Sequence, residues 1–294
     1  MLLPGPVGLW TAALEAVPVA AVGEQVAALD EQGWDALFFA EAYGREALSA
    51  AALYLGASRR MAVATGIASI YGRDAVAAAG AGRLLAALHP GRFVLGLGVS
   101  HAPLVERMRG HSYGRPLAAM REYLDAMDAA RWVSAPAEPA PRVLAALGPA
   151  MLALARDRAQ GAHPYLVTPE HTASAREVLG DGPLLAVEQA VVLSADPEVV
   201  RQRAHWHLEI YTGLPNYRSS WLRQGFSEDD LVRGGSDRLK SAMVVGGEDA
   251  IRTRVQEHLD AGADHVCLQV LGADPFEVPT DDWARLAPVA ASLR

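Results

Sequence analysis

Short apolar runs alternate along the chain with longer segments whose apolar residues recur at helical spacing. The runs are mostly continuous rather than interrupted by polar residues, which is typical of parallel strands that are buried on both faces. We therefore predict strands at Val7–Trp10, Ala36–Ala40, Met61–Ile67, Phe93–Leu97, Val143–Leu147, His163–Val167, Leu184–Leu193 and His265–Leu271. The predicted helices are Val19–Gln32, Arg45–Ala57, Asp74–Leu88, Pro116–Trp132, Pro149–Gln160 and Thr172–Leu179, followed by a long helical stretch from Pro197.

Glycines mark the passages from helix to strand. The segments "LDEQGWDALFF" (29–39) and "LDAGADHVCLQ" (259–269) share a helix end, a glycine, one residue, an aspartate and a strand. Gly33 and Gly262, and Gly161 in a looser copy, are expected to end helices in the left-handed conformation. Eight such units with no linker to a second domain favour one α/β domain over residues 1–294, a (β/α)8 TIM barrel rather than an open doubly wound sheet.

Residues 205–243 break this rhythm. The segment is polar, contains several aromatic residues and is longer than one crossover helix. We expect a helical insertion between strands 7 and 8, of the kind that forms lids or oligomer contacts at the active face of a barrel. Its aromatic residues either line such a lid or bury the insertion against the barrel, and the second role is favoured for Trp206 and Trp221. The set comprises Trp206, Tyr211, Tyr217, Trp221 and Phe226.

The composition excludes several classes of protein. A net charge of −8 leaves no broad basic surface, which argues against binding to the phosphate backbone of nucleic acids. No apolar run is long enough to span a membrane and the N-terminus lacks a basic signal-peptide start, so a cytoplasmic protein is expected. Cys267, the single cysteine, lies in an apolar run and is expected in the core, where it forms neither a disulfide nor a metal site.

Polar residues after the predicted strands are the candidates for chemistry, because active sites of barrels lie at the carboxyl ends of the strands. The glycines of "GLGVSHAP" (96–103) lack the third glycine of a dinucleotide fingerprint, and the chain has no P-loop, HExxH motif or nucleophile elbow. His101 and His111 do not have metal-ligand spacing, so no metal is expected. His101 is either a general acid–base or a loop hydrogen-bonding residue, and Glu41 is either a site residue or a charge at a helix start.

The loop after strand 6, "TPEHT" (168–172), is the candidate anion site. Thr172 is placed to N-cap a helix over 173–179, whose first N–H groups could bind a phosphate with help from His171. A simple threonine cap without a ligand explains the same residues equally well. With no metal or nucleophile motif, small residues at a barrel mouth are typical of enzymes whose bound cofactor supplies the chemistry.

Four segments in order resemble the bacterial-luciferase-like oxidoreductases, in particular the actinobacterial branch that uses the deazaflavin coenzyme F420. These segments are "VATGIASIYGRD" (63–74), "GRFVLGLGVSHAPLVERMRGHSYGRPLAAMREYLDAM" (91–127), "HPYLVTPEHTASAREVLG" (163–180) and "AGADHVCLQVL" (261–271). The resemblance covers nearly the whole chain. It implies a (β/α)8 barrel with an insertion before strand 8 and a flavin-type ring lying across the barrel mouth.

The resemblance also implies a set of site residues. A non-proline cis peptide at Gly66-Ile67 would form a bulge against the middle of the ring. The anionic tail of the cofactor would lie by the loop after strand 6. The expected cofactor-binding residues are Thr65, Gly66, Ile67, Ala68, Ser100, Tyr165, Thr168, His171 and Thr172.

The chain departs from those relatives that oxidise sugar phosphates, which carry a histidine after strand 2 and a glutamate after strand 4. Ala42 and Val99 occupy these places, which disfavours a sugar-phosphate dehydrogenase. The acid–base group is therefore missing or has moved to Ser100, His101 or Glu41, and Glu41 and His101 are the candidate catalytic residues.

What the resemblance implies is hydride transfer between F420 and an unidentified small organic substrate. Two alternatives stay open. One is an FMN-dependent monooxygenase that uses O₂ and reduced flavin from a partner reductase, and the other is a non-catalytic flavin-binding barrel. Because relatives are commonly dimers, a homodimer is expected.

Overall fold

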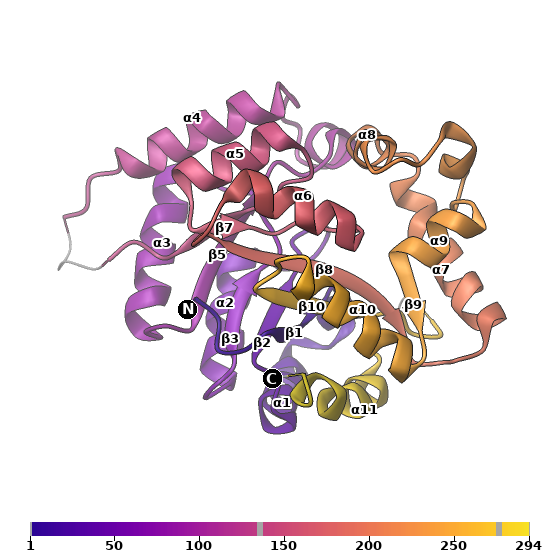
Figure 1. Ribbon diagram of the computed structural model, residues 1–294. Coiled ribbons are helices and arrows are strands. Elements are labelled where there is room, and N and C mark those ends of the chain that lie inside the picture. The colour runs from indigo at the N-terminus through magenta and orange to yellow at the C-terminus, as the bar shows by residue number, and fades with distance from the viewer. Residues whose placement is uncertain (1, 134–137, 275–277, 294) are drawn as a thin grey trace.

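The strands close into a barrel in the computed structural model, which describes residues 2–133, 138–274 and 278–293 (Figure 1). The strand order is β10-β1-β2-β3-β5-β6-β7-β8, and β10 also pairs with β8 in parallel. Eight parallel strands therefore form a closed (β/α)8 barrel, and the predicted fold is confirmed. The strands are β1 (Val7–Thr11), β2 (Ala36–Phe39), β3 (Ala62–Thr65), β5 (Phe93–Gly98), β6 (Arg142–Leu144), β7 (Gly161–Ala162), β8 (Leu184–Val192) and β10 (His265–Val270), with short additional strands β4 (Ala68–Ser69) and β9 (Val244–Gly246).

Helices surround the barrel and follow the strands in the expected alternation. In the described chain these are α1 (Val19–Gln32), α2 (Ala47–Ala57), α3 (Ala75–Leu88), α4 (Pro116–Asp128), α5 (Pro149–Arg158), α6 (Pro169–Leu179), α10 (Glu248–Asp260) and α11 (Thr280–Ala291). Two short 3-10 helices, Ala13–Ala16 and Glu228–Leu231, and one π-helical turn, Leu104–Met108, lie in the connections. None of the described helices is both long and apolar enough to cross a membrane.

The sixth barrel strand differs most from its prediction. The strand is Gly161–Ala162 rather than His163–Val167, and Leu166 interrupts any continuation because its φ of 54° is left-handed. Gly33 and Gly262 end their helices with φ values of 90° and 98°, as predicted. Gly161 does not, because it lies in β7, where a Cβ atom would come within 2.1 Å of the Leu184 carbonyl oxygen. A glycine required for close strand approach and a glycine that ends a helix cannot be told apart by spacing alone.

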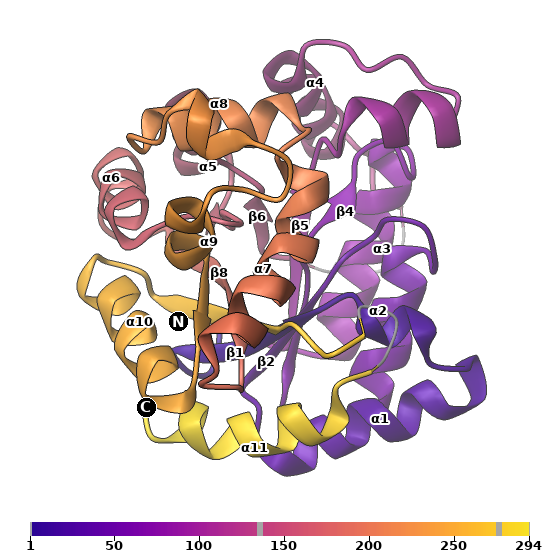
Figure 2. The same cartoon turned by 90° about the vertical axis from the view of Figure 1, so that its right-hand side faces the viewer.

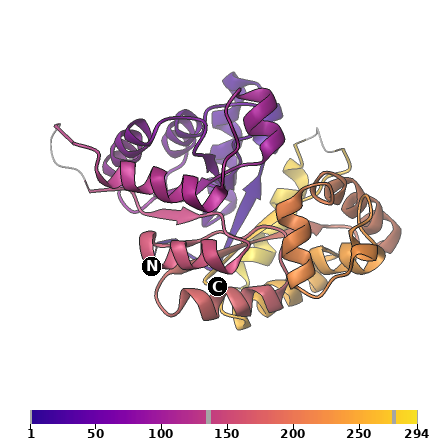
Figure 3. The same cartoon turned by 90° about the horizontal axis from the view of Figure 1, so that it is seen from above.

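The insertion before the eighth barrel strand consists of three helices, α7 (Pro197–Tyr211), α8 (Pro215–Arg223) and α9 (Asp237–Met243), which precede β9. Figures 1 and 3 show these helices grouped on one side of the barrel, with α3 on the other. The helices share a small core in which Trp221 is fully buried, as predicted. The prediction was wrong for Trp206, which is 42% exposed on α7.

Two apolar layers hold the barrel together. One lies between the strands and the surrounding helices. The other fills the barrel interior and contains Trp10, Phe38, Ala64, Val143 and Cys267, which is fully buried as predicted. Since side chains alternate along a strand, these residues identify which positions on each strand point inward.

Candidate functional site

The inward-facing positions at the carboxyl ends of the strands form an uneven ring. Alternation from the interior residues places small residues there on four neighbouring strands, namely Ala40, Gly66, Gly98 and Ala145. The opposite side carries long polar side chains, namely Glu188 on β8, Gln269 on β10 and Tyr165 in the loop after β7. One half of the mouth is therefore lined by small residues, and the other half presents hydrogen-bonding groups.

Trp10 forms the floor of the mouth. Its indole Nε1 donates a hydrogen bond to the Gly66 carbonyl at 2.9 Å, and its ring centroid lies 5.1 Å from that of Tyr165. The Gly66-Ile67 peptide is cis, as the family resemblance implies. A Cβ atom on Gly66 would lie 2.8 Å from Trp10 Nε1, so glycine lets the backbone approach the indole closely.

The neighbours of Gly66 support the backbone rather than present side chains to the mouth. Thr65 is fully buried and donates its hydroxyl to the Gly96 carbonyl at 2.7 Å. Ala68 is buried in β4, which pairs with β5. Ser100 has a left-handed φ of 56°, and its carbonyl accepts a hydrogen bond from the Tyr113 hydroxyl at 3.1 Å. Cofactor contact through these three residues stays a prediction.

Glu41 lies after β2 with its side chain only 4% exposed, and it is fully engaged. Its carboxylate accepts a hydrogen bond from Ser69 N at 2.8 Å and forms an ion pair with the Arg73 guanidinium. Arg109 approaches the same carboxylate at 3.8 Å. Since an arginine and a backbone N–H hold its carboxylate oxygens, Glu41 is suited to fixing the surrounding loops.

His101 packs against the insertion. Its ring lies 5.8 Å from that of Tyr217, and its side chain hydrogen-bonds to that of Asn216. Burial lowers the pKa of His101 below its usual value, although the Asn216 hydrogen bond acts in the opposite direction. The imidazole is therefore neutral at neutral pH and connects the loop after β5 to α8.

A cluster of aromatic side chains covers the polar half of the mouth. The Tyr165 hydroxyl donates to Gln269 Oε1 at 2.7 Å and accepts from the Tyr211 hydroxyl at 3.1 Å. Tyr211 and Tyr217 contact each other edge to face, with ring centroids 4.8 Å apart, and His207 lies beside Tyr211. We define the lid cluster as Tyr165, His207, Tyr211 and Tyr217. It joins the end of the barrel to α7 and α8.

Glu188 is a residue of the mouth that the sequence did not single out as a site residue. It lies on β8 and is 1% exposed, and its Oε2 atom accepts a hydrogen bond from Leu166 N at 3.0 Å. Its Oε1 atom is buried and has no hydrogen-bond partner. Burial raises the pKa of this carboxyl to about 8, against the lowering effect of the Leu166 hydrogen bond. A glutamate inside the apolar run "LLAVEQAVV" was the available sequence signal.

The start of α6 differs from its prediction. The helix begins at Pro169, and Thr168 is its N-cap, because its hydroxyl accepts a hydrogen bond from His171 N at 3.3 Å. Proline suits the first helical position since its missing N–H would have no helical partner. Thr172 is therefore not the cap. It is fully buried, and its hydroxyl lies 2.8 Å from His258 Nδ1, away from the mouth.

His171 and Arg223 form a candidate anion-binding site at the starts of α5 and α6, which we call the tail grip. His171 Nε2 and Arg223 Nη2 both donate to the Leu147 carbonyl, at 3.1 and 3.2 Å. His171 Nδ1 is buried and without a partner, and Arg223 lies over Gly148, the N-cap of α5. Sequence reasoning missed Arg223, because it comes from the insertion and reaches this loop only through the fold.

These residues fit a flat cofactor with an anionic tail. At the mouth, Gly66 packs closely against Trp10 and Gly98 against Ile67, which keeps bulky side chains off these two strand ends. The start of α6 provides an orphaned histidine nitrogen, a guanidinium and two helix N-termini within one region. Among the described residues, no group of histidines, cysteines and carboxylates is arranged to hold a metal ion.

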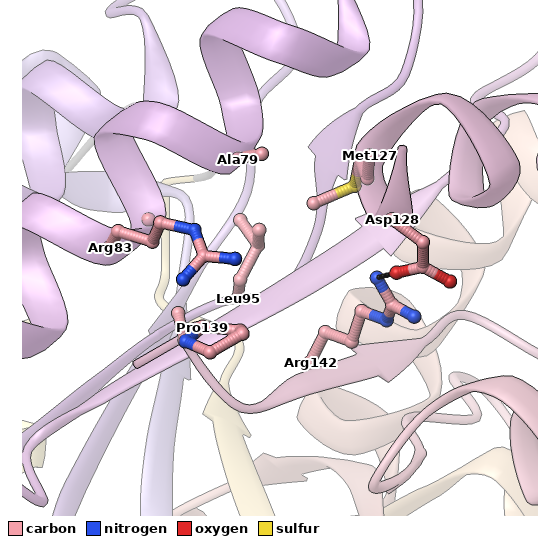
Figure 4. Close-up of a pocket in the computed structure, with 9 residues that line it drawn as sticks. Ala79, Arg83, Leu95, Met127, Asp128, Pro139 and Arg142 are labelled. Carbon is pink, nitrogen blue, oxygen red and sulfur yellow. Dashed lines mark hydrogen bonds and ion pairs between the residues drawn. The ribbon is translucent and has the colours of Figure 1, made fainter. Parts of the chain in front are cut away.

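A pocket of about 160 Å³ lies elsewhere, on the outside of the barrel between α3, α4, β5 and β6 (Figure 4). Leu95 and Met127 line it, and the ion pair between Arg142 and Asp128 closes one side at 2.8 Å. Because Arg142 begins β6 and the pocket lies outside the strands, this pocket is separate from the barrel mouth.

Comparison with known proteins agrees with this geometry. The chain is 38% identical over 102 residues to Rv3520c of Mycobacterium tuberculosis, which is named as a candidate coenzyme F420-dependent oxidoreductase. That match spans 35% of this chain and 29% of the length of the relative. An F420-dependent secondary alcohol dehydrogenase, solved with an F420-acetone adduct, shares the fold at a TM-score of 0.76 and 14% identity over 99% of each chain.

A second solved structure contains FMN. It is the oxygenating constituent of 3,6-diketocamphane monooxygenase from Pseudomonas putida, with a TM-score of 0.68 and 14% identity over 98% of each chain. The sequence model described as luciferase-like monooxygenase matches residues 1–265. On the strength of that match, the chain belongs to the luciferase-like monooxygenase family of oxidoreductases.

Proposed function

We propose that the chain is an F420-dependent oxidoreductase that transfers hydride between the deazaflavin and a small organic substrate. The uneven barrel mouth carries this proposal. Its half with Gly66 and Gly98 has only small residues at the strand ends, where a ring would rest, and its opposite half carries Tyr165, Glu188 and Gln269, which would face the substrate. The match to Rv3520c supports F420 as the cofactor.

Each part of the site would have a separate task. The Gly66-Ile67 segment and the Trp10 floor would support the ring, while His171 and Arg223 would hold the anionic tail. The insertion would act as a lid, because the lid cluster excludes water from the polar half of the mouth. Bound F420 supplies a carbon centre that gives or takes hydride, so the chain provides orientation and a dry environment.

A fluorescence titration tests the cofactor assignment. Purified protein is expected to bind F420 more tightly than FMN, in line with the match to Rv3520c. Equal or reversed affinities would remove F420 from the proposal. Turnover of any substrate with reduced F420 would also exclude a barrel that only stores the cofactor.

An FMN-dependent monooxygenase is the second candidate, favoured by the description of the family and by the FMN-bound Pseudomonas structure. Such an enzyme would receive reduced flavin from a partner reductase. Oxygen uptake separates the two candidates, since reduced FMN reacts readily with O₂ and reduced F420 reacts poorly. Rapid oxygen consumption with reduced FMN, dependent on this protein, would favour the monooxygenase.

A further inference from the structure

The proposed reaction needs a proton donor that the two predicted candidates do not provide. The Glu41 carboxylate is held in an ion pair with Arg73, with Arg109 also close, on the loop after β2. His101 is neutral, because burial lowers its pKa, and it is held against the insertion by Asn216 and Tyr217. A neutral imidazole carries no proton that it releases easily at neutral pH.

Glu188 occupies the place where a donor is needed. In the closed strand order, β8 lies four strands from β3 in both directions, so Glu188 and Gly66 face each other across the mouth. Glu188 points inward, because it continues the alternation of Leu184 and Ala186 and pairs in register with inward-facing Cys267. A ring resting on Gly66 would thus have this carboxyl on its far side.

The surroundings of Glu188 keep its proton on. The titratable groups facing it are Tyr165 from the loop after β7, Tyr211 and Tyr217 from the insertion, and Cys267 from β10. All four are neutral, and in the described chain Glu188 forms no ion pair. With its pKa raised to about 8, Glu188 is a protonated acid at neutral pH. It is a stronger acid than Tyr211, whose pKa burial raises to about 12.

We propose that Glu188 is the catalytic acid of this enzyme and that the substrate is a molecule with a polarised C=C or C=O bond, which the enzyme reduces. The inference rests on the proposed function, with reduced F420 as the hydride donor. Hydride adds to the electron-poor carbon, and the π electron pair moves toward the oxygen. The O–H bond of Glu188 breaks as its proton bonds to the substrate, which gains two electrons and two hydrogens in all. The carboxylate then takes a proton from solvent.

The first test needs neither cofactor nor substrate. Infrared difference spectra of the ligand-free wild type against Glu188→Gln are expected to show a protonated carboxyl band at about pH 6 that disappears with an apparent pKa near 8. A carboxylate band alone at about pH 6 would overturn the assignment.

The second test follows oxidation of reduced F420 with cyclohexenone and cyclohexanone as probe substrates. Glu188→Gln is expected to lower kcat about a hundredfold or more while the F420 dissociation constant stays within about twofold. Glu188→Asp, which keeps an acid, should fall between the two. Glu24→Gln, at an exposed position on α1, is the control for loss of a glutamate and should retain the wild-type rate.

The outcomes separate this inference from the proposed function. Glu188→Gln with wild-type kcat, or a wild type that binds reduced F420 but reduces neither probe, would overturn the role of Glu188 or the substrate class. A wild type that fails to bind F420 would instead overturn the proposed function, and the infrared measurement would still decide the protonation of Glu188.

Discussion

At the scale of single residues, two glutamates near the mouth show how environment decides the chemistry of a carboxyl. Glu41 lies between arginines and backbone N–H groups, which hold its oxygens in ion pairs and hydrogen bonds. Glu188 lies among neutral side chains with one oxygen unpartnered, which favours its protonated form. Glu188 therefore keeps a proton that it can release to a neighbour at neutral pH.

The raised pKa of Glu188 predicts an unusual dependence of stability on pH. Below about pH 4 the carboxyl is protonated in both the folded and the unfolded chain, so it does not affect the balance. Between that value and about 8, the unfolded chain releases a proton that the folded chain retains, so its free energy of unfolding falls as pH rises. Glu188→Gln should therefore gain stability over the wild type by up to roughly 1.4 kcal/mol for each pH unit in this window.

Urea denaturation at several pH values measures this effect. Glu24→Gln, at an exposed position on α1, is the control and should track the wild type at every pH. A constant difference between Glu188→Gln and the wild type across the window would show that Glu188 is ionised in the folded protein.

The tail grip makes a second residue-scale prediction. Because the Leu147 carbonyl can only accept, His171 Nε2 carries the proton of the neutral ring and Nδ1 has none to offer an anion. Burial lowers the pKa of His171, and the charge of Arg223 lowers it further. The hydrogen bond to the Leu147 carbonyl acts in the opposite direction. A bound anion favours the doubly protonated ring, so F420 should bind more tightly as the pH falls and the ring takes up its second proton.

His171→Ala is expected to weaken F420 binding by about 1–2 kcal/mol and to remove this pH dependence. Arg223→Ala should weaken binding to a similar extent but leave the pH dependence in place. Arg233→Ala, which removes another arginine from the insertion, is the control for overall charge. If His171→Ala binds F420 like the wild type at all pH values, the grip is not at this loop.

At the scale of elements, a buried polar chain fixes α6 against the barrel and α10. Thr172 on α6 meets His258 on α10, whose Nε2 donates to Gln189 Oε1 on β8 at 3.1 Å. Gln189 also donates to the Met243 carbonyl at 2.9 Å, next to β9. This series of hydrogen bonds holds the start of α6, and with it the tail grip, in a fixed position relative to the strands.

Thr172→Val keeps the shape of the side chain and leaves His258 Nδ1 buried without a partner. We expect it to lower the free energy of unfolding by about 1–3 kcal/mol, with an unchanged denaturant slope. Thr253→Val on α10 removes a hydroxyl that is exposed, and its cost should be small. Equal costs for the two variants would mean that the Thr172–His258 contact adds nothing to stability.

The sequence predicted an element well where burial sets its ends, and less well where tertiary contacts set them. Long strands and helices were placed well, because burial on both faces leaves continuous apolar runs. β7 and the start of α6 were misplaced, since the left-handed Leu166 and the cap at Thr168 follow from tertiary contacts with Glu188 and Gln224. Glu188 is visible in the sequence as a glutamate in the apolar run of a strand, but its role was not predicted, and Arg223 was overlooked because it reaches the loop after β6 only through the fold.

At the scale of the whole molecule, the barrel closes as expected, but one flank stays apolar. Helix α3, seen at the right in Figure 2, exposes Val76, Leu84 and Leu88, the last two by 56% and 63%. The insertion lies on the other side of the barrel (Figure 3). We propose that two chains associate through α3, which would leave both mouths open to solvent.

The variant Leu84→Glu with Leu88→Glu is expected to convert a dimer of the wild type into a monomer in light scattering after size exclusion. Buried like charges across a two-fold axis repel, so the change should be large. Ile210→Glu, an equally exposed apolar position on α7, should leave the mass unchanged. A wild type that is monomeric at every concentration would rule out this association.

Trp10 gives the molecule a built-in optical reporter. Its indole is hydrogen-bonded to the Gly66 carbonyl on one side and contacts Tyr165 on the other, with the two rings inclined by 52°, beneath the proposed ring position. A chromophore bound there would accept excitation energy from the Trp10 indole far more efficiently than from Trp283, which lies between the barrel and the helices. Loading of the mouth should therefore be visible as quenched ultraviolet emission that Trp10→Phe abolishes, with no label attached to the protein.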